Sequence, residues 1–61
     1  MDPLKSILNE INQRRDAILR ALADGAAKDF AEYRELCGEV RGLSFSHMLI
    51  TDLVRKIEEN D

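Results

Sequence analysis

The chain has 61 residues, of which 44% are hydrophobic and 34% charged, so it is one small domain and not a disordered tail. Its single cysteine excludes an internal disulfide, and one cysteine with one histidine falls short of a four-ligand zinc site. The net charge of −3 argues against binding to nucleic-acid backbones, and there is no apolar run of the length that spans a membrane. A core of this size supplies only about 3–5 kcal/mol, so we expect an oligomer or a partner surface to supply the rest.

The first predicted helix covers residues 3–23. Asp2 is a good N-cap, Pro3 suits the first helical position, and Gly25 suits the left-handed residue that follows a helix. Arg15 occupies the one position of the repeat that is not apolar. The apolar residues of this repeat, spaced by four and three, are Leu4, Leu8, Ile11, Ile18 and Leu22.

A turn at 24–26 leads to a second helical segment, predicted over 27–58. Its apolar stripe again has steps of four and three residues: Leu36, Val40, Leu43, His47, Ile50, Val54 and Ile57. The phase continues through Gly42, which favours one helix, continuous or bent. The alternative is a break there, with Ser44 capping a third helix. The predicted fold is all-α, an antiparallel helical hairpin with coiled-coil-like spacing, or a three-helix arrangement if the chain breaks.

A turn this short gives arms of unequal length. The first helix then covers the second only to about residue 45, so the remainder of the apolar stripe lacks a partner within the chain. An exposed apolar row marks an association surface. The residues we expect to carry association are Leu43, His47, Ile50, Val54 and Ile57.

Small residues recur along one side of the second segment, and we expect Ala31, Gly38 and Gly42 to allow close helix packing. The favoured interpretation is that they admit the first helix within the hairpin. The alternative is a seat for a helix of a second subunit or of another protein.

Three polar residues fall on or near apolar faces. Arg15 is expected to reach water from the edge of its face, the alternative being a buried ion pair with a glutamate of the second segment that sets the register. His47 is interpreted as a core or interface residue, and Cys37 as a small buried hydrophobe.

The sequence contains no recognisable catalytic, phosphate-binding or metal-binding motif. A two-helix hairpin also lacks the cleft of about 300 Å³ or more that holds a substrate. We therefore expect no enzyme activity, no cofactor, no metal and no small-molecule substrate.

Residues 31–44, AEYRELCGEVRGLS, resemble a pattern in very small proteins of tailed bacteriophages, in which AEYRxLCGxxRGL follows a GxAxDF turn. Residues 25–30, GAAKDF, are similar to that turn, and the likeness covers residues 16–59. The genes of these proteins tend to lie among head and tail structural genes. The resemblance implies a minor virion or assembly component, located in the virion or the host cytoplasm. Its partner would be a larger phage structural protein, further copies of the chain, or both.

Two alternative functions remain open at this point. The architecture is similar to that of the plasmid copy-number regulator Rop, a hairpin dimer that binds RNA. Arg14, Arg15 and Arg20, doubled by symmetry, would give such a dimer a modest basic face. The other alternative is a small regulatory inhibitor of a host protein.

Overall fold

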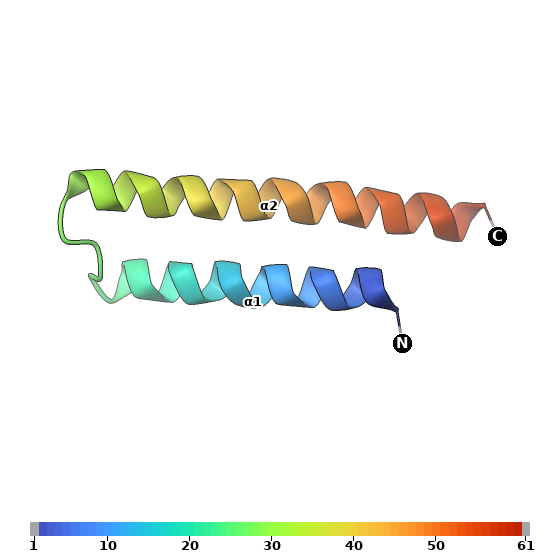
Figure 1. The fold of residues 1–61 in the computed structure, drawn as a ribbon, viewed down its shortest axis with the longest axis horizontal. Coiled ribbons are helices and arrows are strands. Elements are labelled where there is room, and N and C mark those ends of the chain that lie inside the picture. Colours follow the sequence, from blue (N-terminus) through green and yellow to red (C-terminus); the bar gives the residue numbers. More distant parts are fainter. Residues whose placement is uncertain (1, 61) are drawn as a thin grey trace.

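The computed structural model describes residues 2–60 and consists of two long helices side by side (Figure 1). Helix α1 spans Pro3–Ala23 and helix α2 spans Phe30–Glu59. The chain reverses direction between them, so the helices are antiparallel. The predicted all-α helical hairpin is confirmed.

Helix α1 begins and ends where its capping residues predict. The Asp2 side chain accepts hydrogen bonds from the backbone N–H groups of Leu4 at 3.0 Å and Lys5 at 3.4 Å. At the other end Gly25 has a φ of 78°, a conformation that costs glycine little. The N–H of Gly25 bonds to the carbonyl of Leu22 and that of Ala26 to the carbonyl of Ala21, which satisfies the last turn of the helix.

The connection between the helices is longer than predicted. Helix α2 begins at Phe30 and not at residue 27, so the predicted turn at 24–26 is wrong and the connection covers 24–29. The reason is Asp29, whose extended backbone and side chain cap α2: its carboxylate accepts a hydrogen bond from the N–H of Glu32 at 2.8 Å. The aspartate three residues before a glutamate was the available signal.

Helix α2 is continuous through Gly42 and ends at Glu59. The alternative of a third helix capped by Ser44 is therefore wrong. Gly42 costs a helix about 1 kcal/mol relative to alanine, which does not break a 30-residue helix whose apolar phase is kept on both sides.

Helix α1 covers α2 far beyond residue 45, so that prediction is also wrong. Lys5, near the start of α1, lies 3.9 Å from a carboxylate oxygen of Glu58, near the end of α2. His47, Ile50 and Val54 are half-buried. The cause is the longer connection: α2 extends past α1 at the connected end, which moves α1 towards the C-terminal half of α2 (Figure 1).

The core of this hairpin is very thin. Within residues 2–60 only Ile18 is fully buried, with 6% of its surface exposed. The molecule measures 49 × 18 × 13 Å, which is little more than one helix diameter in its shortest dimension. Because each helix has only one neighbour, its opposite face is left to solvent.

Candidate interaction surface

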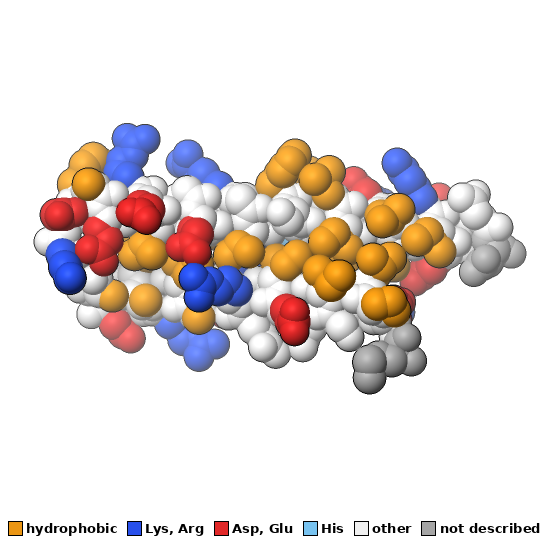
Figure 2. Space-filling model, in the orientation of Figure 1, with side chains coloured by type: hydrophobic (Ala, Val, Ile, Leu, Met, Phe, Trp, Pro, Cys, Tyr) orange, Lys and Arg blue, Asp and Glu red, His pale blue; other side chains and the backbone are white. Residues whose placement is uncertain are grey.

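The outer face of α2, defined here as Phe45, Met48, Leu49 and Leu53, is unusually apolar for a solvent-exposed surface. These side chains are 58%, 51%, 51% and 47% exposed respectively, and they lie within nine consecutive residues. Figure 2 shows hydrophobic side chains gathered over this half of the hairpin, on α2 and along its junction with α1. Large contiguous apolar patches are a common feature of protein association sites, which makes this face the candidate interaction surface.

The residues that the sequence predicted for association lie mostly elsewhere. Leu43, His47, Ile50 and Val54 are half-buried on the side of α2 that faces α1, whereas Ile57 is 48% exposed. The longest apolar repeat of the sequence does not contain the members of the outer face, so it did not predict them. A shorter repeat was the available signal, in steps of four: Phe45, Leu49, Leu53 and Ile57.

The glycines of α2 also lie on the solvent side. A Cβ atom built on Gly38 or Gly42 would meet no other atom within 4 Å, and Ala31 is exposed. The favoured interpretation, that these small residues admit α1, is therefore wrong. Helix geometry explains this: two residues rotate the chain by about 200°, so Gly38 and Gly42 point away from Leu36 and Val40. The alternative, that these small residues allow close packing against a helix of a second protein, stays a prediction.

The ion pair with a glutamate of the second segment, which was the alternative prediction for Arg15, is made by its neighbour Arg14. Arg15 is half-buried and donates a hydrogen bond to the side-chain oxygen of Asn12 at 2.8 Å, in its own helix. It is Arg14 that pairs across the hairpin, with a carboxylate oxygen of Glu39 at 3.0 Å. Both side chains of this ion pair are substantially exposed. The pair therefore helps to align the two helices but contributes little to the stability of the hairpin.

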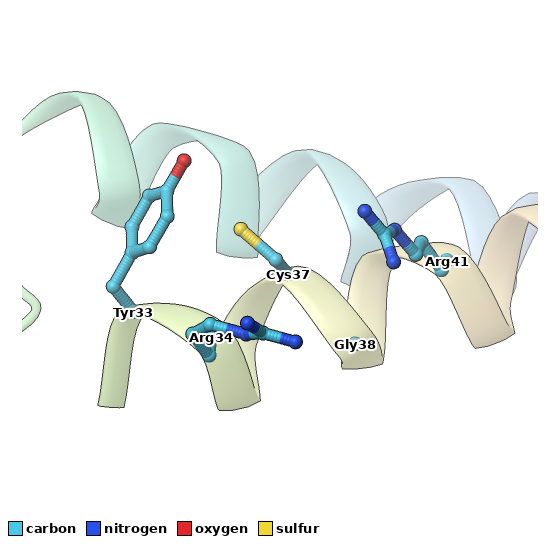
Figure 3. A pocket seen from close by; sticks show the side chains of 5 residues that line it. All are labelled: Tyr33, Arg34, Cys37, Gly38 and Arg41. Atoms are coloured by element: carbon cyan, nitrogen blue, oxygen red, sulfur yellow. The ribbon is translucent and has the colours of Figure 1, made fainter. Parts of the chain in front are cut away.

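A hollow of about 370 Å³ opens on α2 beside the outer face, so the expectation that the hairpin has no cleft of about 300 Å³ or more is wrong (Figure 3). Tyr33, Arg34, Cys37, Gly38 and Arg41 line it, and the absence of a side chain on Gly38 leaves its floor open. A hydrogen bond with the Cys37 thiol, and then the charge of the thiolate, raise the pKa of Tyr33, while the charge of Arg41 acts in the opposite direction. The hollow therefore places two arginine guanidinium groups beside two weak acids, the Tyr33 hydroxyl and the Cys37 thiol.

Other candidate chemistry is sparse along residues 2–60. The Nδ1 atom of His47 lies 3.4 Å from the hydroxyl oxygen of Thr51, one turn later on the same helix. Cys37 is a free, half-buried thiol. The described part of the chain contains no cluster of three or more histidine, cysteine or carboxylate side chains suited to a metal ion.

Neither α1 nor α2 is long and apolar enough to cross a membrane. No family model matches the chain, and no curated protein or solved structure matches it either.

Proposed function

We propose that this protein is a non-enzymatic association protein that works by packing the outer face of α2 against another protein surface. The observation that carries the proposal is a contrast within residues 2–60: one side chain is fully buried, whereas the four large apolar side chains of the outer face are about half exposed. Burying the exposed half of each would contribute about 1 kcal/mol per side chain. That sum is comparable to the whole stability expected of so small a core, about 3–5 kcal/mol.

For the biological setting we propose a minor virion or assembly component of a tailed bacteriophage. The support is the resemblance of residues 31–44 to small phage proteins, together with the need for a partner surface that the thin core creates. Mass spectrometry of purified particles from a phage that encodes the chain tests this setting. The proposal expects a constant number of copies per particle, and particles without the chain contradict it.

The RNA-binding alternative stays a prediction with less support. Arg14 and Arg15, two of its three basic residues, are engaged with Glu39 and Asn12. Binding through phosphates falls steeply with salt, so a gel-shift titration that begins at low salt tests it directly.

The association surface is tested by site-specific photo-cross-linking in cells that produce the protein. A photoreactive amino acid replaces Leu49 on the outer face, and in a control chain it replaces Leu19 of α1. The two leucines are 51% and 45% exposed, so the probes are equally accessible to passing molecules. We expect a defined protein adduct from position 49 and none of comparable yield from position 19. Equal adducts from both positions, or none from position 49, would refute the proposal.

A further inference from the structure

We propose that the partner of the outer face is a second copy of this chain, bound with the two α2 helices antiparallel and in one register. This inference rests on the proposed function, since it names the partner of the same surface. It is carried by the arrangement of charges on α2, which is self-complementary under a two-fold axis and repulsive in the parallel arrangement.

The charges lie on one face of α2 at heptad spacing. Arg34 and Arg41 are seven residues apart in the first half of the helix, and Asp52 and Glu59 are seven residues apart in the second half. Arg34 and Glu59 lie at equal sequence distances from the point between Ser46 and His47. The same holds for Arg41 and Asp52. A two-fold axis at that point places each arginine opposite a carboxylate of the other copy, four times per dimer.

The other residues of the row, from Gly38 to Arg55, are related in pairs by the same two-fold axis. Phe45 and Met48 are also centred on that point, so each Phe45 ring would meet the partner's Met48, a contact that sulfur and aromatic rings favour. The same axis places Arg55 opposite the partner's Gly38, where the structure has open space. Arg55 pairs with Asp52 of its own helix, so in the dimer each Asp52 carboxylate would lie between two arginines, its own Arg55 and the partner's Arg41.

The spacing from Arg34 to Glu59 alternates between four and three residues without interruption, which is the spacing of a coiled-coil contact row. The composition differs, because Phe45 and Met48 are its two large apolar side chains and ion pairs would flank them. The row lies on the side of α2 away from α1, because Phe45 and Leu43 are about 200° apart around the helix. Figure 3 shows Arg34 and Arg41 on either side of Gly38, around the hollow that the partner's second half would fill. In a parallel dimer Arg41 would face Arg41 and Asp52 would face Asp52, so the charges select against that arrangement.

Charge-reversal variants of the full chain test this register by sedimentation equilibrium. In the Arg41→Glu homodimer two acidic side chains oppose the partner's Asp52, and in the Asp52→Arg homodimer two basic side chains oppose the partner's Arg41. Each variant alone should dimerise about tenfold more weakly than the parent. An equimolar mixture of the two variants restores opposite charges in every layer and should recover the parental dimer. Arg20→Glu, with the same charge change on the exposed side of α1, should leave dimerisation unchanged, and circular dichroism checks that each variant stays helical.

The outcomes separate this inference from the proposed function. Dimerisation of the single variants equal to the parent, or no recovery in the mixture, would overturn the antiparallel register. A parent that stays monomeric throughout would overturn the second copy as the partner. A cross-link from position 49 to a different protein would then still support the proposed function, whereas the absence of any such cross-link would refute both.

Discussion

Replacement of Ile18 by alanine tests whether the hairpin depends on this side chain, the one that is fully buried among residues 2–60. Truncating a buried isoleucine to alanine costs about 2–5 kcal/mol, through lost transfer free energy and the cavity left behind. The neighbours of Ile18 are half-exposed and can relax into the space, so we expect the lower end of that range, about 2–3 kcal/mol. For a domain of this size the melting temperature should fall by roughly 10–20 °C.

The assay is urea unfolding followed by circular dichroism at one fixed protein concentration, because association makes apparent stability depend on concentration. The matched control is Ile7→Ala, the same change at a side chain that is 43% exposed. We expect the control to cost less than about 1.5 kcal/mol. Equal losses from the two variants would show that Ile18 is not the centre of the core and would refute this account of the packing.

Other predictions concern the caps, the glycines and the hollow. Asp29→Ala removes the N-cap of α2 and should destabilise the chain by about 1 kcal/mol in urea unfolding, whereas no loss would contradict the capping geometry. Gly42→Ala should stabilise the monomer by up to about 1 kcal/mol, since its Cβ meets open space, and a loss of stability at low protein concentration would contradict that placement. Tyr33 is the only tyrosine, so its ionisation can be followed by ultraviolet absorbance, and its titration should lie above the ordinary value near 10. Cys37→Ala should lower that pKa, because the hydrogen bond and the thiolate charge that raise it are removed, and an unchanged titration would contradict the contact.

The sequence was sufficient for the limits of α1 and for the continuity of α2 because these signals are local. Asp2, Pro3 and Gly25 set the limits of α1, and the apolar phase through Gly42 favoured one continuous α2. These features depend on residues within a few positions of each other, where capping and periodicity act directly.

The pairing of the helices was harder to predict because it depends on the length of the connection. Treating Asp29 as part of the second helix shortened the loop by three residues and displaced α1 along α2. That displacement produced the expectation that Ile50 and Val54 lack a partner, although both are half-buried. The three-residue error in the length of the connection thus led to a wrong prediction of which face of α2 is exposed.

The direction of the glycines was predictable and was missed. Gly38 and Gly42 stand two residues after Leu36 and Val40, and this separation places them on the opposite side of the helix. The ion pair of Arg14 with Glu39 was not predictable in the same way. Whether Arg14 or Arg15 reaches α2 depends on the rotation of α1 about its axis, which the tertiary packing determines.

The central claim is that the outer face of α2 is covered by a second copy of the chain, and light-scattering mass measured over a concentration series tests it most directly. The chain has a mass of 7.0 kDa. Between about 1 µM and about 1 mM, a range that covers weak and strong association, we predict a rise from this mass to twice this mass. The Leu49→Asp variant should require a higher concentration for the same rise. A mass that stays at that of one chain across the whole series would contradict the account.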